Sequence, residues 1–317
     1  MSHELTLGKD GRAEMAYCGD APWHGLGQRL QLGSPIEVWS EQAGMNWLIK
    51  RSRVRFGECE KQQTMEDQHV LFRSDNKAAL GIVSDKYKIV QPIECLEFFR
   101  DLVADNGFSL HTAGTLFGGR KFWALASINE SAVITGMDKV DGYLLLTSSC
   151  DGSMATTAKF TTVRVVCNNT LSMSLRAKDR REVAVSHRTK FEADRTKQAL
   201  GVVSGVFAEF IRASRTLASR PLTFNDAMHL TAQLCNEQKL SVKEDVRESK
   251  GFASIMTLFE NGQGNHGETA WDWLNGVTEF VDHVQRASTN DHKLANSWYG
   301  KGDALKTAAM ELALNNC

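Results

Sequence analysis

Apolar and polar residues follow two different patterns along this chain, and the change between them falls near residue 190. Before that point, apolar residues alternate with polar ones or form short runs between turn residues, as they do in β-strands. After it, apolar residues recur every three or four positions between Gly, Pro and Asn, which indicates amphipathic helices. The chain is therefore predicted to be α+β, with a mainly antiparallel sheet over residues 45–190 and a helical region over 191–317.

The clearest piece of architecture is residues 70–128, which read β-β-α-β-β. The helix is predicted over 92–107, where apolar residues recur at helical spacing, and it should pack on the sheet. Gly118 and Gly119 separate the last two strands. Because the chain has no Gly-Lys-Ser/Thr loop and no strand-GxGxxG-helix unit, a hairpin turn is the expected role of these glycines.

The N-terminal segment, residues 1–44, combines turn-forming residues with aromatics. It is predicted to form a loop or hairpin followed by a short helix over 35–44, where Pro stands at the start and Gly at the end. Residues 45–190 and 191–317 are expected to share one core, because a change of periodicity and no flexible linker separates them.

The formal net charge of −1 hides a local asymmetry. Residues 161–200 contain nine Lys/Arg and four Asp/Glu, a balance of +5, so the remainder of the chain carries −6. A basic patch on an acidic body is the footprint expected of polyanion binding, since phosphates are neutralised by clustered cations. The alternative from charge alone is a solvated face.

A buried strand leads directly into this basic segment. Residues 160–166 are apolar enough to anchor in the core, and Asn168 to Thr170 have side chains suited to capping a following helix. The cations beyond them would then lie on a fixed surface and lose little ordering entropy on binding. A second basic row is predicted at Arg51, Arg53 and Arg55, which alternate with other residues as on one face of a strand.

These segments and the Gly118-Gly119 turn predict a surface that binds single-stranded DNA or RNA without sequence preference. Trp123 and Tyr143 are candidates for base stacking, although both stand in apolar runs that favour core packing. The cationic residues expected at this surface are Arg51, Arg53, Arg55, Arg120, Lys121, Arg176, Lys178, Arg180, Arg181, Arg188 and Lys190.

An enzymatic or host-interference function is the alternative. It would act at the turn from Cys150 to Ser153, with His111 or His187 as base, or at the Trp23-His24 loop. No spacing in the sequence joins a nucleophile to a base, so no catalytic residue is assigned and a binding function is favoured over catalysis. The seven cysteines are scattered without a CxxC pair, and neither a metal nor a cofactor is expected.

The chain begins without a charged-then-apolar leader and has no apolar run long enough to cross a bilayer, so a cytoplasmic protein without a membrane partner is expected.

Three stretches resemble the phage/plasmid-like family of uncharacterised proteins. They are "AEMAYCGDAPWHGLG", "YLLLTSSCDGSMATTAKFTTVRVVCNNTL", and "TAWDWLNGVTEFVDH" followed by "SWYGKGDALKTAAMELAL". The resemblance covers nearly the whole chain in the same order, but members often have His, Pro and Gln where this chain has Cys150, Thr162 and Asn168. It implies a setting in phages, plasmids and integrated elements, hence the cytoplasm of a bacterial host, and brings no established active site.

The order of elements is also similar in outline to phage single-strand annealing proteins, in which a sheet and a helix carry Lys and Arg and subunits assemble into rings or filaments. This analogy implies a DNA recombination function and a homo-oligomer.

Overall fold

The computed structural model confirms the α+β class, with mainly antiparallel sheets and a helical C-terminal region. The residues that it describes are 7, 11–19, 25–58, 61–105, 107–164, 169–173, 182–200, 205–240 and 245–316. Within these ranges, no helix has both the length and the apolar character needed to span a membrane.

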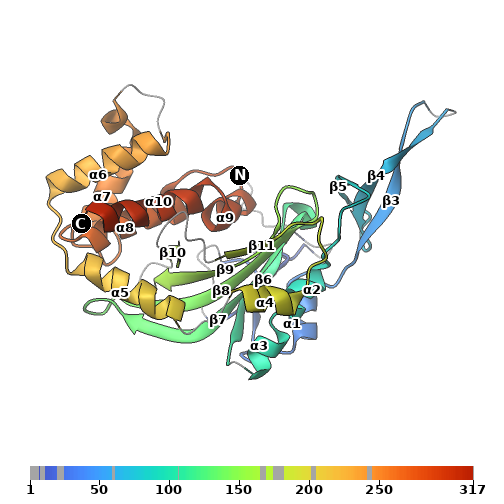
Figure 1. The fold of residues 1–317 in the computed structure, drawn as a ribbon, viewed down its shortest axis with the longest axis horizontal. Coiled ribbons are helices and arrows are strands. Elements are labelled where there is room, and N and C mark those ends of the chain that lie inside the picture. Colours follow the sequence, from blue (N-terminus) through green and yellow to red (C-terminus); the bar gives the residue numbers. More distant parts are fainter. Residues whose placement is uncertain are drawn as a thin grey trace. The chain divides into compact units, whose positions relative to one another are not determined.

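The larger sheet has the order β10-β9-β8-β7-β6-β1-β2, with β11 paired to β9 (Figure 1). β1 pairs with β2 in parallel, whereas β1 with β6, β6 with β7, β9 with β10 and β9 with β11 are antiparallel. The N-terminal segment therefore contributes strands to the sheet, which its turn-rich sequence did not predict. The strands are β1 (Met15–Cys18), β2 (Gln28–Leu30), β6 (Ser109–Leu116), β7 (Lys121–Val133), β8 (Lys139–Ser149), β9 (Thr156–Arg164), β10 (Asn169–Ser172) and β11 (Glu182–Val185).

A second sheet contains β3 (Ile49–Phe56), β4 (Gln63–Arg73) and β5 (Ala79–Ser84), in the order β3-β4-β5 and antiparallel throughout. The expectation of one sheet over residues 45–190 is thus corrected: the first two strands of the β-β-α-β-β unit form a separate sheet with β3, and the last two pair in the larger sheet. The strand predicted around the alternating arginines is confirmed as β3, and the hairpin turn at Gly118-Gly119 is confirmed between β6 and β7.

The helix predicted over 92–107 is divided into α2 (Pro92–Glu97) and α3 (Arg100–Asp105). The break falls at Phe98 and Phe99, two consecutive residues that are both fully buried and pack edge-to-face. Neighbouring residues on a continuous helix point in well-separated directions, so the break allows both rings to reach the core. The short helix predicted over 35–44 is confirmed as α1 (Ile36–Gln42).

The chain divides into two compact units. The first consists of Met1–Asn129, Leu144–Lys159 and Glu182–Gly201, and the second of Glu130–Tyr143, Phe160–Arg181 and Val202–Cys317. The boundaries fall inside β7, β8 and β9, so each of these strands contributes residues to both units. Each unit is described separately below.

In the first unit, a buried ion pair holds the base of the smaller sheet. Both terminal nitrogens of Arg73, at the end of β4, donate to the Glu14 carboxylate at 2.9 and 2.7 Å. The guanidinium also donates to Asp75 and lies over the Trp47 ring, 4.2 Å from its centroid. Two hydrogen-bonded carboxylates and an aromatic face compensate the burial of this cation. The unit's remaining helix is α4 (Ala193–Leu200), which is joined to α3 by a 3.0 Å ion pair between Lys197 and Asp101.

The second unit is organised around α8, which is buried along almost its whole length. An α-helix that buries every face belongs in the centre of a bundle. Both of its tryptophans donate to buried partners: Trp271 to Asp138 at 2.7 Å and Trp273 to Thr231 at 2.9 Å. The unit's helices are α5 (Val206–Ala218), α6 (Phe224–Glu237), the 3-10 turn Val246–Glu248, α7 (Lys250–Asn261), α8 (Ala270–Glu279), the π-helical turn η4 (Phe280–Val284), α9 (Asn290–Tyr299) and α10 (Lys301–Asn316).

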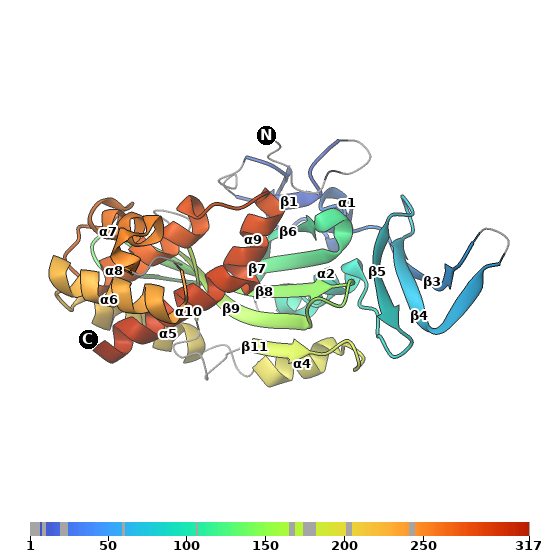
Figure 2. The ribbon, with the colours of Figure 1, turned by 90° about the horizontal axis from the view of Figure 1, so that it is seen from above.

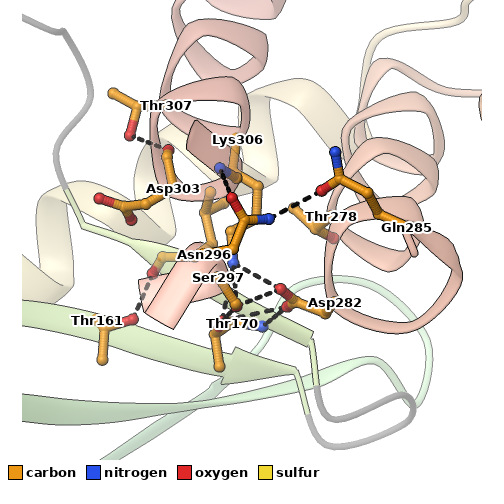
Figure 3. A network of polar contacts seen from close by, with 12 residues as sticks. Thr161, Thr170, Thr278, Asp282, Gln285, Asn296, Ser297, Asp303, Lys306 and Thr307 are labelled. Atoms are coloured by element: carbon orange, nitrogen blue, oxygen red, sulfur yellow. Dashed lines mark hydrogen bonds and ion pairs between the residues drawn. The ribbon is translucent and has the colours of Figure 1, made fainter. Parts of the chain in front are cut away.

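A buried cluster of polar side chains joins β10 to this bundle (Figure 3). Lys306 of α10 is 1% exposed, and its Nζ donates to Asp282 Oδ1 at 2.8 Å, Thr170 Oγ1 at 2.9 Å and Ser297 Oγ at 3.1 Å. The second oxygen of Asp282 accepts from the Thr170 backbone N–H at 2.7 Å. All three ammonium donors are therefore satisfied. Thr170 lies in a strand, so its predicted role in capping a following helix is wrong.

Candidate nucleic-acid interface

Within the first unit, β3 and β4 continue together beyond the end of β5 (Figures 1 and 2). A register shift in β4 separates the three-stranded base from this outer part. Outside it, Val54 pairs with Met65, Arg55 with Thr64 and Phe56 with Gln63, none of which pairs with β5. We call this two-stranded ribbon, residues 54–56 and 63–65, the arm. No other described strand pairs with these residues.

The predicted arginine row runs along β3 onto the arm. Arg51, Arg53 and Arg55 occupy alternate positions and are all exposed. Since a strand rises about 3.3 Å per residue, consecutive arginines begin about 6.6 Å apart on the same face. β3 is an edge strand, so one side of its backbone and this row face solvent together.

Among the described residues, one carboxylate lies near this row. Arg53 approaches Glu66 at 3.9 Å, but both side chains are largely exposed, and such a pair contributes little. Arg51 and Arg55 form no ion pair with any described residue. No described carboxylate therefore neutralises the charge of these two side chains.

Two further predicted cations lie at the turn between β8 and β9. The Cys150 backbone N–H donates to the Arg120 carbonyl at 2.8 Å, which places Arg120 beside the first residue of this turn. Arg188 lies on the turn's other side, where it shares a pocket of about 220 Å³ with Gly152 and Met154. Both arginines are exposed, and neither forms an ion pair with a described residue.

The same turn packs against the smaller sheet. Gly81 of β5 approaches it so closely that a Cβ at this position would lie 2.8 Å from Asp151 Cα. Gly81 is paired with Leu71, which is paired in turn with Arg51. The base of the arginine row and the β8–β9 turn therefore belong to one connected part of the first unit, although their cations are distant in sequence.

The structure describes two of the remaining predicted cations and leaves the other four outside its described ranges. Lys190 is exposed, and Lys121 is half-buried with its ammonium 5.6 Å from the centroid of the Phe117 ring. Four residues lie outside the described ranges, and their role stays a prediction: Arg176, Lys178, Arg180 and Arg181.

Arg188 follows a residue that is firmly anchored. The His187 ring stacks on Tyr87 with centroids 4.5 Å apart, and its Nδ1–H donates to the Lys88 carbonyl at 3.0 Å. Burial lowers the pKa of His187, although the carbonyls of Lys88 and Met154 oppose this shift, so the neutral ring is favoured. The sequence offered His187 as a candidate catalytic base. In the structure, its ring contacts hold the segment that carries Arg188.

The geometry of Cys150 does not suit a nucleophile. Its Sγ donates to the carbonyls of Gly119 at 3.2 Å and Arg120 at 3.4 Å, and burial raises its pKa to about 12. The thiolate is the reactive form of cysteine, so this thiol is held unreactive at neutral pH. Trp23 and His24, the other enzymatic candidates, lie outside the described residues. In the described part of the chain, no three His, Cys, Asp or Glu residues form a group that could hold a metal.

We expect Cys150 to resist alkylation by iodoacetamide in the native protein near neutral pH and to react fully after denaturation, because both burial and its raised pKa suppress the thiolate. Peptide mass spectrometry of native and denatured samples measures this directly. Rapid native modification of Cys150 would contradict the assignment and revive a nucleophilic role for the turn.

The two aromatic residues proposed for stacking are buried. Trp123 is 1% exposed and donates to Thr112, and Tyr143 is 7% exposed. Both pack in the core, and neither is accessible to a base. The exposed aromatic near the arginine row is Phe56, which is 50% exposed. The sequence signal for it was its place at the end of an alternating basic strand, where no apolar run surrounds it.

Comparison with known proteins gives a family and no activity. No curated protein matches the chain, and no solved structure matches it. The pattern of one family, described as a domain of unknown function (DUF932), matches residues 79–298, about two thirds of the chain. The matched segment contains Arg120, Arg188 and the β8–β9 turn, whereas β3 and β4 precede it. The chain belongs to the DUF932 family.

Proposed function

We propose that this protein binds single-stranded nucleic acid, DNA or RNA, through the arginine row of β3 and the cations at the β8–β9 turn. The observation that carries the proposal is the row itself: Arg51, Arg53 and Arg55 at alternate, exposed positions of an edge strand, with one distant carboxylate partner in the described part of the chain. A regular line of uncompensated cations fits the regular line of charge on a phosphate backbone.

Two other cations of the first unit, Arg100 and Lys197, are paired with carboxylates, unlike Arg51 and Arg55 of the row. Arg100 is held by Glu97 and Glu37 at 2.5 and 2.8 Å, and Lys197 by Asp101 at 3.0 Å. These side chains are engaged within the protein. Arg51, Arg55, Arg120 and Arg188 differ from these two cations in forming no ion pair with a described residue.

A charged edge strand has a second recognised purpose, which is to prevent pairing with other chains. That purpose accounts for charge on β3 but gives no reason for the exposed Arg120 and Arg188 at a neighbouring turn. A phosphate backbone accounts for both sets. The resemblance to phage and plasmid proteins supports the same proposal, and we propose DNA recombination in a mobile element as its setting, with a homo-oligomer as the working form.

The proposal is tested by fluorescence anisotropy with labelled oligothymidylate, oligouridylate and a duplex of mixed sequence. We expect micromolar or tighter binding of the single strands at low salt and little sequence preference. The logarithm of the binding constant should fall linearly with the logarithm of salt concentration, with a slope near −0.7 per phosphate contacted. Absence of binding to all three probes at low salt would refute the proposal.

A further inference from the structure

We infer that Phe56 is a base-stacking residue and that the apolar face of the arm receives unstacked bases of the bound strand. This inference rests on the proposed function and deepens it. It assigns the recognition of single strands, as opposed to duplexes, to one exposed ring.

The arm has two chemically different faces. Residues opposite each other in an antiparallel pair share a face, so Arg55 and Thr64 lie on one side, and Val54, Met65, Phe56 and Gln63 lie on the other. The first side continues the arginine row. The second carries three apolar side chains beside Gln63, and no other described strand pairs with this ribbon.

The two largest side chains of this face are exposed. Phe56 is 50% exposed and Met65 39% exposed. Apolar side chains stabilise a fold when they are removed from water, so these two contribute little while they are exposed. A two-stranded ribbon is also only marginally stable by itself. Exposed apolar side chains on a ribbon whose opposite face carries the arginine row fit a ligand that is both anionic and apolar.

A second copy of this chain is a poor occupant. Antiparallel pairing of two β3 edges would place arginine rows opposite each other, and like charges directly opposite are destabilising. A single nucleic-acid strand satisfies both faces, because its phosphates are anionic and its bases have apolar, polarisable faces. Charge complementarity therefore selects the nucleic acid, with phosphates at Arg51, Arg53 and Arg55 and a base at Phe56.

Replacement of Phe56 tests the inference with the full chain. Base-aromatic stacking is sequence-tolerant, and its loss on Phe56→Ala is expected to weaken oligothymidylate binding about 5- to 150-fold. Phe56→Leu, which keeps an apolar side chain without a ring, should lose a similar factor, and Phe56→Trp should retain nearly full affinity. The salt dependence should keep the parent slope, because no phosphate contact is removed.

Two controls separate stacking from other effects. Leu32→Ala removes another exposed apolar side chain of the first unit, 76% exposed, and should leave affinity unchanged. A strand of equal length with abasic sites keeps the phosphates, so the parent and Phe56→Ala should bind it equally.

The outcomes are distinguishable. If Phe56→Ala or Phe56→Leu binds oligothymidylate as tightly as the parent does, the stacking role is wrong while the proposed function stands. If the parent binds no nucleic acid, the proposed function itself fails. If Phe56→Ala instead abolishes an oligomer seen by light scattering and leaves nucleic-acid binding intact, the face belongs to self-association and the inference is overturned.

Discussion

Reversal of the arginine row, Arg51→Glu, Arg53→Glu and Arg55→Glu together, is expected to weaken binding of single-stranded oligonucleotides on the order of 100-fold at about 0.1 M salt. The size follows from counterion release: three phosphate contacts in a single strand change the logarithm of the binding constant by about 2 for each tenfold change in salt. The slope of the salt dependence should fall by about the same amount. Anisotropy titrations over a salt series measure both quantities.

A matched control keeps the total charge change but moves it to the second unit. Arg212→Glu, Lys250→Glu and Lys301→Glu are three reversals at exposed helical positions. This control should lose only the small part of the binding free energy that comes from long-range attraction to the phosphates. The slope of its salt dependence should stay at the parent value. Equal losses in both triple variants would show that net charge alone matters, and the row would then have no special role.

The thermal stability of the arginine variant should stay near that of the parent, because these side chains are exposed and two of them pair with no described residue. Circular dichroism of the melting transition provides this check. It separates lost binding from lost folding, which is essential for a strand that also forms the edge of its sheet.

The largest effect on stability is expected at Lys306. Lys306→Met keeps much of the side chain's volume but leaves the Asp282 carboxylate buried without its cation, and removing one member of a buried pair costs about 3–5 kcal/mol. Loss of the ammonium also removes donors to Thr170 and Ser297. Urea unfolding followed by the helical signal should show a midpoint well below that of the parent.

Lys301→Met is the control on the same helix. Lys301 is exposed at the start of α10, so this change should alter the free energy of unfolding very little. The double variant Lys306→Met/Asp282→Asn removes both charges and should recover part of the loss, since the amide oxygen can still accept from the Thr170 backbone N–H. A Lys306→Met protein as stable as Lys301→Met would mean that the cluster contributes nothing to folding.

Much of the local structure follows from the sequence because local structure depends on local spacing. The alternation of Arg51, Arg53 and Arg55 predicts the strand that is observed, and the three-to-four periodicity beyond residue 190 predicts the helices of the second unit. The Gly118-Gly119 turn is also where it was expected. In each case neighbouring residues alone decide the backbone conformation.

Contacts between residues far apart in the sequence could not be predicted from local spacing. Nothing near Lys306 distinguishes it from a solvated lysine on an amphipathic helix, yet its ammonium bonds to Thr170, 136 residues earlier. The break at Phe98 and Phe99 has the same origin, since both rings have a core to enter only once the rest of the first unit is present.

The sequence by itself determined the α+β class, the order of most elements and the existence of a basic row on a strand. Only the tertiary structure decided that β3, β4 and β5 form a sheet of their own and how far Phe56 is exposed on it. The apolar run around Trp123 already favoured core packing, whereas no such run surrounds Phe56. Whether a strand face is covered depends on what packs against it from elsewhere in the chain, and that is a property of the assembled fold.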